Sequence, residues 1–498
     1  MPSVQPSNRG SKFQHGGALL VMLVILVMGI TTVFVNSLSG PAISNKRHQA
    51  TAAALAQAKE ALIGYAVKVQ LSSSDITCAD PSHSYANPNC PRPGDLPCPD
   101  MDNDGEAETN CGDAIGSNQS KRLGRLPWKT LGLPDLRDGS GERLWYAVSN
   151  NFKNSTRTRC SNSNFAGCLN SDTTGTITVF GTDGSATNTA GSVTGAVAVI
   201  IAPGSPLVRQ DGVSQDRGCT VNVDCDVKDK CITSPPTNTA KCDPVNYLDV
   251  ATVGINTQDN KSFTDGLATD GFIHGRILDS HGQTLLNDEL LVISQDNIML
   301  PIQKRVAAEV KNCLIEYAAI AQNNHYYPWA ATRTVVSGTA SYPDTNDLKF
   351  GRIPDQPFDD TRNESCDETD DCDVGNSSDG MKDVWGTSCT LNNNNWWVNW
   401  KEVVFYSLAQ SLRPHDLEHN HSCPSSTCIV VNPPSTTDDK AFVVILAGKK
   451  LISLGQVRTS DADKANSGNY LEDANADGAT PYQQSPTSAT FNDIVVFP

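Results

Sequence analysis

The residues best suited to chemistry are the acidic side chains of one short stretch, 100–108, which reads Asp-Met-Asp-Asn-Asp-Gly-Glu-Ala-Glu. Carboxylates at Asp100, Asp102 and Asp104 alternate before a glycine, which is the spacing of a loop that surrounds a hard cation such as Ca²⁺. Glu108 is a fourth candidate ligand. Cys111 stands where an EF-hand carries its bidentate Glu, so the loop is not an EF-hand. The sequence predicts a structural Ca²⁺ site here, and a solvated acidic turn is the alternative.

A second acidic stretch near the carboxyl end has related spacing. Asp473, Asn475 and Asp477 form a weaker Ca²⁺ candidate, because Asn holds the middle position and no acid follows downstream. The acidic run 367–373 lacks the glycine spacing, and we expect a solvated loop there.

Motifs for catalysis are scarce. The sequence contains no Gly-x-Ser-x-Gly, no His-Glu-x-x-His and no phosphate-binding glycine loop. His415, His419 and His421 lie close to acidic residues, where a polar loop is a better interpretation than a metal site. The sequence therefore predicts a protein that is not an enzyme.

Sixteen cysteines, mostly in clusters, indicate disulfide bonds formed in an oxidising compartment. Zinc is disfavoured because no pair has the Cys-x2-Cys spacing. Cys313 stands alone in a helical pattern. The candidate disulfide residues are Cys98 and Cys111, Cys160 and Cys168, and Cys423 and Cys428.

Composition narrows the compartment and the partners. The chain has 498 residues and a net charge of −17, with 38% hydrophobic and 19% charged residues. Such a composition fits a β-rich extracytoplasmic protein with long loops. No basic patch is available for nucleic acid, so we expect no nucleic-acid partner.

An apolar run near the start of the chain must position everything that follows. No Lys, Arg, Asp or Glu occurs between Phe13 and Asn45, and residues 18–35 are long enough to cross a bilayer as a helix. A buried core helix and a cleaved secretory signal are the alternatives. Beyond Gly40-Pro41, the stretch 49–69 carries apolar residues at helical spacing, which predicts one long helix with a membrane-embedded first half.

A basic leader ending in Gly, followed by this apolar helix, resembles the signal of type IV pilins and type II secretion pseudopilins. The resemblance implies cleavage by prepilin peptidase between Gly16 and Gly17 and methylation of the new amine; cleavage after Gly17 is the other register. Most pilins carry Glu at mature position five, where this chain has Val21, or Met22 in the other register. The minor, tip-type members of the family share this substitution.

Several short motifs occur twice in the same order, which indicates a tandem duplication. Both copies contain a helix, a Gly-Arg pair before an apolar residue and Pro, two strand-like segments, an Asn-Tyr-Leu-acid motif and a final strand. The clearest pairs are 61–66 with 313–318, 124–127 with 351–354, 142–148 with 402–408, 198–202 with 443–447, 246–249 with 469–472, and 286–291 with 491–496.

The expected fold class is α+β, with a long N-terminal membrane-embedded helix packed on a mainly antiparallel sheet and a second tandem pilin-like helix-plus-sheet module. The leader is expected at 1–16, the stem helix at 17–70, the first module at 71–298 and the second at 299–498. The second helix is expected to begin near Leu300-Pro301, since Pro is tolerated in a first turn.

The resemblance implies a minor, tip-type structural subunit that initiates or caps a type IV pilus or type II secretion pseudopilus. It implies assembly with other pilins or pseudopilins through the N-terminal helix. The implied location is the inner membrane with periplasmic domains, and then the filament tip at the cell surface. One alternative is a tip adhesin that binds a surface or receptor through the second module. Trp396, Trp397 and Trp400, if exposed, could bind glycan or a partner, although packing of a short helix onto its sheet explains these residues better. A secreted hydrolase on a pilin-like anchor is the other alternative.

Overall fold

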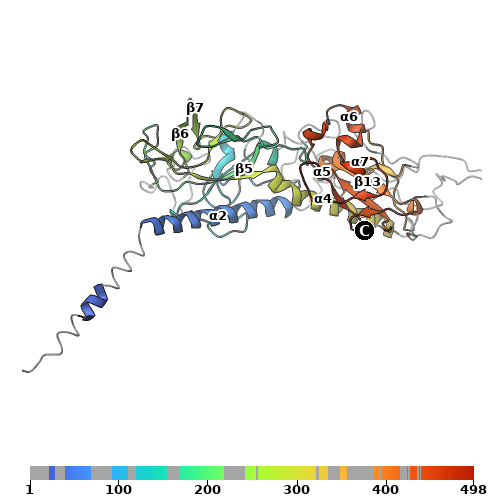
Figure 1. Cartoon of the computed structure of the whole chain (residues 1–498), viewed down its shortest axis with the longest axis horizontal. Helices are drawn as coiled ribbons and strands as arrows, with labels where there is room; N and C mark the ends of the chain where they lie inside the picture. Colours follow the sequence, from blue (N-terminus) through green and yellow to red (C-terminus); the bar gives the residue numbers. More distant parts are fainter. Residues whose placement is uncertain are drawn as a thin grey trace, which may run out of the picture.

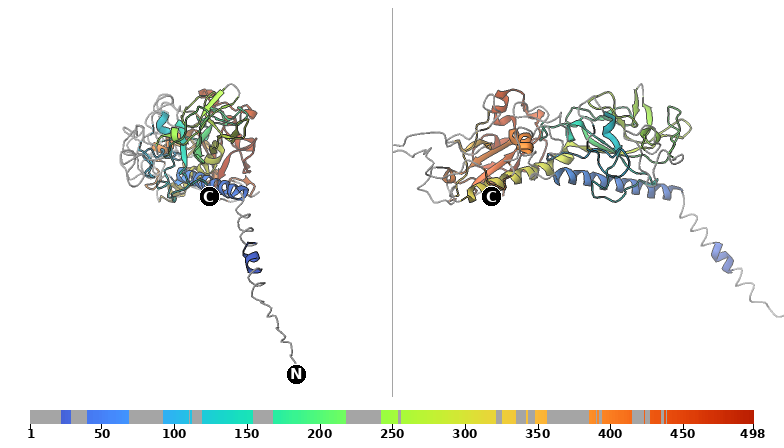
Figure 2. Two further views of the ribbon diagram at one scale, coloured as in Figure 1. Left: turned by 90° about the vertical axis from the view of Figure 1, so that its left-hand side faces the viewer. Right: turned by 180° about the vertical axis from the view of Figure 1, so that it is seen from behind.

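A computed structural model gives the architecture of the chain (Figure 1). Two long helices lie along one side of an elongated molecule, and a strand-rich body covers each of them (Figures 1 and 2). The structure describes residues 22–28, 40–68, 92–109, 111, 119–153, 168–217, 242–253, 256–320, 325–334, 342, 348–355, 385–389, 391, 394–414, 423, 427–434, 437 and 439–498.

The first long helix, α2, spans Gly40–Lys68. Pro41 lies in the first turn of α2 as described, where a missing N–H is tolerated. A stripe at helical spacing is buried: Ala54, Leu55, Ala58, Leu62 and Ala66. This stripe packs on strands β5 and β11 of the first sheet.

The first sheet has four antiparallel strands in the order β1-β2-β5-β11. Every residue of β5 is buried, because α2 covers one face and small sheets cover the other. The strands are β1 (Leu123–Arg125), β2 (Trp145–Val148), β5 (Ala196–Ala202) and β11 (Glu289–Ser294). The small sheets are made of β3 (Val179–Phe180), β4 (Ala186–Asn188) and β8 (Phe272–Ile273), of β6 (Val250–Val253) and β7 (Asn256–Asp259), and of β9 (Ile277–Leu278) and β10 (Thr284–Leu286).

The second sheet repeats this topology in the order β12-β13-β15-β17, and the long helix α4 packs on it. Its strands are β12 (Phe350–Arg352), β13 (Val404–Leu408), β15 (Phe442–Leu446) and β17 (Ile494–Val496). The remaining elements are α4 (Gln295–Ala319), α5 (Asn394–Trp400), α6 (Asp461–Ala465), α7 (Asp473–Ala476), β14 (Val431–Asn432) and β16 (Tyr482–Gln483). We call residues 40–294 the first module and residues 295–498 the second module.

The helix α4 begins earlier than the sequence suggested. It starts directly after β11 because Ser294 and Asn297 form a capping box, and Pro301 lies inside the helix instead of at its start. The expected boundary at residue 299 therefore falls within a helix.

The expected membrane-embedded helix is wrong. The expected fold class therefore loses its long N-terminal membrane helix, and the expected transmembrane pilin stem is wrong as well. Within the described ranges, no helix combines the length and the apolar character needed to cross a membrane. Of the apolar run only 22–28 is described, and α2 begins beyond the run. The helix that packs on the first sheet is charged, since Lys46, Arg47 and Lys59 interrupt its alanines.

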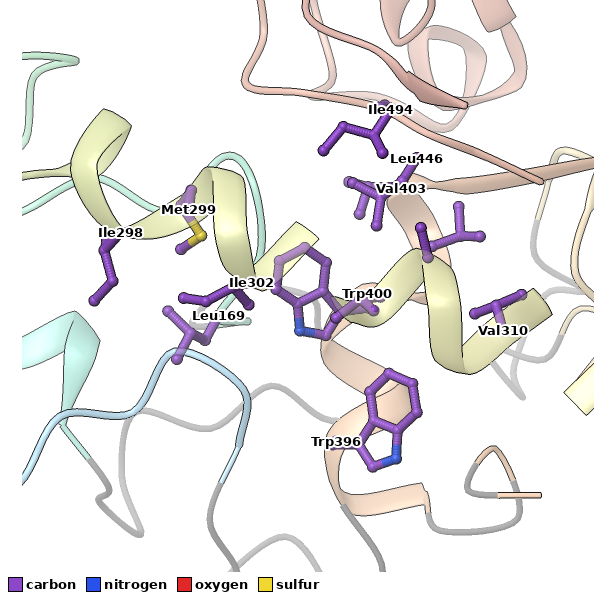
Figure 3. Packing of buried hydrophobic residues seen from close by; sticks show 14 of the residues in the cluster. Leu169, Ile298, Met299, Ile302, Val310, Trp396, Trp400, Val403, Leu446 and Ile494 are labelled. Carbon is purple, nitrogen blue, oxygen red and sulfur yellow. The ribbon is translucent and has the colours of Figure 1, made fainter. Parts of the chain in front are cut away.

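One hydrophobic core runs through both modules. It includes the buried stripe of α2, the buried face of α4 and the inner faces of both sheets. Figure 3 shows Leu169 of the first module lying beside Ile302 of α4, close to Trp400 of the second module. The two modules are therefore packed against each other without an intervening polar layer at this point.

Candidate functional site

The acidic loop is anchored to the first strand of the first sheet. The Asp100 N–H donates to the carbonyl oxygen of Arg125 at 2.9 Å, and the Arg125 N–H donates back at 2.8 Å. A disulfide between Cys98 and Cys111 closes the chain around the loop. Closing a loop of this length restricts the unfolded chain, which contributes about 3 kcal/mol of stability.

Three of the four predicted ligands of this loop come together. One oxygen each of Asp100, Asp102 and Glu108 lies within 4.8 Å of the others. Asp104 is not part of this cluster, and its Oδ1 accepts a hydrogen bond from the Glu106 N–H at 2.8 Å. The donors are all carboxylate oxygens, which suit Ca²⁺ or Mg²⁺ better than a softer metal.

Asp100 is the buried member of the cluster. Burial, helped by the charges of Asp104 and Asp102, raises its pKa to about 7, against hydrogen bonds from the backbone of Gly105 and Asn103. The Gly105 N–H donates to Asp100 Oδ2 at 2.7 Å. A cation bound between the carboxylates would displace the proton, so the loop has the chemistry of a cation site that competes with H⁺ near neutral pH.

The second, weaker Ca²⁺ candidate is not assembled. Asn475 is buried, and its amide nitrogen donates to Asp493 Oδ2 and to the Gln483 carbonyl oxygen, both at 3.0 Å. Its Oδ1 accepts from the Gln483 N–H at 2.8 Å. Asp473 and Asp477 are exposed, and the described residues show no metal-type cluster that includes them. Asn475 instead belongs to a polar network that occurs in both modules.

Each module has a buried arginine at the end of the first strand of its sheet. The Arg125 guanidinium lies 4.2 Å from the ring centroid of Trp145 and 4.0 Å from that of Tyr247. Arg352 lies in the same way, 3.8 Å from Phe405 and 4.3 Å from Tyr470. Burial lowers the pKa of Arg125 to about 10, so the group stays charged at neutral pH. Desolvated cation–π contacts of this kind contribute about 2 kcal/mol.

A second arginine packs on the same tyrosine from a following loop. Arg217 Nη1 donates to the Gly204 carbonyl oxygen at 2.7 Å, and Arg458 Nη1 donates to the Gly448 carbonyl oxygen at 3.1 Å. The guanidinium carbons lie 4.8 Å and 4.3 Å from the rings of the two tyrosines. A glutamine two residues earlier accepts from each arginine. These contacts fix the loop that leaves the third strand of each sheet.

A buried pair of carboxyl groups completes each copy of the network. The Asp249 N–H donates to Asp288 Oδ2 at 2.8 Å, and the Glu472 N–H donates to Asp493 Oδ2 at 3.0 Å. An asparagine amide reaches the same oxygen in each module, at 2.9 Å from Asn260 and 3.0 Å from Asn475. The last strand of each sheet is thereby tied to the Asn-Tyr-Leu-acid segment.

Burial favours the protonated form of one carboxyl group in each pair. Burial and the charge of Asp249 raise the pKa of Asp288 well above its usual value, and burial and the charge of Glu472 do the same for the pKa of Asp493. Their hydrogen bonds run to the backbone and to neighbouring amides, so the network stabilises the fold.

The network explains the repeated motifs of the sequence. The Gly-Arg pairs, the Asn-Tyr-Leu-acid motifs and the Asn-Asp pairs before the last strands all meet in it. The strand register shows that the match of 198–202 with 443–447 is shifted by one residue. Tyr146 pairs with Ile200 in the first sheet and Tyr406 pairs with Val444 in the second, so Ile200 corresponds to Val444 and not to Ile445. Fully buried strands carry no alternation that fixes register.

The junction between the modules is polar around its apolar centre. Arg458 Nη1 donates to both oxygens of Asp172, at 3.0 and 2.9 Å, and the Lys450 N–H donates to Asp172 Oδ1 at 2.9 Å. Asn399 Oδ1 accepts from the Leu169 N–H at 2.9 Å. Loop 169–172 of the first module is therefore held on the second module by hydrogen bonds to its backbone and its side chains. The two long helices also meet, since Lys59 Nζ of α2 donates to Asn297 Oδ1 of α4 at 2.9 Å.

Other predicted residues are placed as follows. Trp396, Trp397 and Trp400 are buried, which confirms the packing interpretation and removes them as exposed binding residues.

Two further disulfides lie in the second module. Cys423 bonds to Cys428, and Cys313 bonds to Cys389, a pair that the isolated position of Cys313 did not suggest. Cys168 is also disulfide-bonded. Cys160, Gly16, Gly17, the His415–His421 cluster and the acidic run 367–373 lie outside the described residues.

Sequence reasoning did not foresee the network as a site, although it found the motifs that form it. Gln215 and Arg217, and likewise Gln456 and Arg458, form a Gln-x-Arg motif that was detectable in both copies. No protein-family model matches this chain, and no curated protein or solved structure is significantly similar to it.

Proposed function

We propose that this chain is a structural subunit of an extracytoplasmic filament, of the minor, tip-type pilin or pseudopilin kind. The observation that carries the proposal is the in-line stacking of two modules with the same sheet order and the same buried polar network (Figure 1). Packing of one such module on the end of another is a contact that could repeat between successive subunits of a filament, which supports the proposal. The proposal does not depend on a membrane-spanning helix.

The disulfides support the extracytoplasmic location, because closed loops such as Cys98–Cys111 and Cys313–Cys389 persist in oxidising compartments. In this proposal the acidic loop binds Ca²⁺ through Asp100, Asp102 and Glu108 and stiffens the edge of the first sheet. The ion is structural, the chain catalyses no reaction, and its partners are other filament subunits and prepilin peptidase.

The deciding experiment is sequencing of the mature amino terminus from purified filaments. We expect an N-methylated residue at position 17 or 18, and we expect the chain to co-purify with filament subunits in substoichiometric amounts. A mature chain that starts beyond residue 37, or that is absent from filaments, would refute the proposal. Trp396, Trp397 and Trp400 are buried, so an adhesin function would need another surface of the second module.

A further inference from the structure

The docked loop of the first module lies in a socket of the second module. The socket is formed by the first turns of α4, by Gly448 and Lys449 after β15, and by Asn492 before β17. Gln295 Nε2 donates to the Ser171 carbonyl oxygen at 2.6 Å, next to the contacts of Asp172. With the loop in place, a cavity of about 270 Å³ remains.

The first module has the same socket at the amino-terminal half of α2. Gly204 corresponds to Gly448, because each accepts from the second arginine of its network, and Asn287 corresponds to Asn492, because each amide donates to the next carbonyl, of Ser205 or Lys449. The helices correspond as well, since Ala66 and Ala318 accept equivalent backbone hydrogen bonds. Four residues of α2 that line the first-module groove therefore match four of α4 that line the second-module socket: Ser44, Arg47, His48 and Thr51 match Asp296, Met299, Leu300 and Gln303.

This first-module groove has a volume of about 730 Å³, more than twice the space left in the occupied socket. Its floor includes Leu55 and Leu290, and His48 Nδ1 bonds to Glu289 at 2.6 Å on its rim. The groove of the first module is larger than the socket of the second, as expected if the groove lacks a docked loop such as 169–172. Among the residues that the structure describes, no loop lies in the groove as 169–172 lies in the socket.

The groove differs from the socket at three residues that hold loop 169–172 in the socket: Lys450 and Arg458, which bond to Asp172, and Gln295, which bonds to Ser171. Leu207 and Leu451 both donate their N–H to the network glutamine, so Pro206 stands where Lys450 donates to Asp172, and proline has no N–H. Arg217 Nη1 faces Glu142 of its own module at 3.4 Å, whereas Arg458 faces Asp172. Ile43, which is 40% exposed, stands at the position of Gln295.

We infer that this groove is the docking site for another filament subunit, which inserts a loop from the end of its own module that has no carboxylate at the position of Asp172. The inference rests on the proposed function and adds the surface and the kind of partner. The intramolecular junction supplies the geometry. Pro206 and the internal Arg217–Glu142 pair remove the two contacts that hold Asp172 in the socket, so they disfavour a carboxylate at that position, and Ile43 removes the side-chain donor to the loop backbone. The 169–172 segment of a second copy of this chain is not available as this loop, because its own second module already covers it.

A groove-filling variant tests the site. Ala52 is exposed and lines the groove, whereas its neighbour Ala53 is exposed on the same helix and does not line it. We expect Ala52→Trp to lower the amount of the chain in purified filaments about tenfold or more, because the ring occupies the space of the incoming loop. Ala53→Trp should assemble within about twofold of wild type, and both variants should melt like wild type. Normal assembly of Ala52→Trp would overturn the inference.

Cross-linking identifies the occupant. A photoreactive amino acid at position 52 should cross-link to a loop of a different filament subunit, identified by mass spectrometry of assembled filaments, and the same group at exposed Val193 should not. A cross-link to a second copy of this chain, to lipid, or to nothing would overturn the inference. If wild type is present in filaments and these tests fail, only the docking site is refuted; if wild type is absent from filaments, the proposed function fails as well.

Discussion

Two buried carboxyl groups of the first module have raised pKa values with different consequences. Asp100 lies in a loop with two further carboxylates, so a divalent cation can replace its proton. Asp288 lies in the core, where its Oδ2 accepts from a backbone N–H and from the amide of Asn260. The first group is suited to bind an ion, and the second group is suited to remain protonated.

Asp100 makes calcium binding and stability depend on pH. Its folded pKa of about 7 lies above the unfolded value, so the folded chain binds more protons between about pH 4 and 7, and metal-free stability falls as the pH rises through this window. At pH 7.5, saturating Ca²⁺ should raise the melting temperature by several degrees, since binding at 100 times Kd contributes about 2.7 kcal/mol. At pH 5.5 the rise should be smaller.

Scanning calorimetry with Ca²⁺ or chelator checks this. Asp100→Asn should abolish the calcium-dependent rise, and Glu106→Gln, in the same loop but outside the cluster, should retain it. A melting temperature of wild type that chelation leaves unchanged at pH 7.5 would remove the proposed site.

Asp288→Asn tests the protonated carboxyl group. Because the folded pKa is raised, wild type loses stability as the pH rises above about 4, and the amide removes this loss while keeping an acceptor oxygen. We expect the free energy of unfolding to lie within about 1 kcal/mol of wild type at pH 5 and to decline less steeply toward pH 8. Urea unfolding at several pH values measures both. An identical pH dependence in wild type and variant would contradict the assignment, and Asp288→Ala, which leaves two donors unsatisfied, should lose about 1–3 kcal/mol at every pH.

At the scale of the elements, the first strand of each sheet depends on a glycine. A Cβ at Gly351 would lie 1.9 Å from the Ala331 carbonyl oxygen, because the backbone of Ala331 pairs closely with the neighbouring Arg352. A Cβ at Gly64, in the middle of α2, would meet no atom within 4 Å. Substitution by alanine is therefore expected to destabilise the protein at Gly351 and to be tolerated at Gly64.

Gly351→Ala should lower the free energy of unfolding by about 1–3 kcal/mol, since a backbone contact must open. Gly64→Ala should raise it by about 0.5–1 kcal/mol, because alanine is the better helix former. Chemical denaturation of the two variants beside wild type gives both values. Equal stability of Gly351→Ala and wild type would show that the strand pairing is looser than described.

The elements also show what a sequence can reveal. Helical spacing identified the buried stripe of α2, and repeated motifs identified the segments that form the network. The pairing of Cys313 with Cys389 was not predictable, because 76 residues separate the two thiols and only the packing of α4 brings them together. The expected membrane-embedded helix was wrong. It joined the apolar run to the stripe of 49–69 in one helix, whereas α2 begins at Gly40, after the run, and no helix among the described residues could span a membrane.

At the scale of the whole molecule, we expect the shared core at the junction to make the two modules unfold as one unit. Leu169 is fully buried in the shared core and lies beside Ile302 (Figure 3). Leu169→Ala should cost about 2–5 kcal/mol and split the single melting transition into two, because it weakens the contact between modules without entering either sheet. Leu286→Ala, buried in a small cluster of the first module, should lower stability without splitting the transition. Calorimetry distinguishes the two, and a single transition for Leu169→Ala would show that the modules are coupled elsewhere.

The covalent link through Ser294, where β11 passes directly into α4, has a consequence for stoichiometry. Two modules made as separate chains would meet at their cellular concentration and could exchange, whereas modules in one chain meet at a high effective concentration and in a fixed one-to-one ratio. The loop 169–172 can therefore hold its place with few contacts. A gene that encodes both modules also fixes their order, so the inner and outer positions cannot be swapped during assembly.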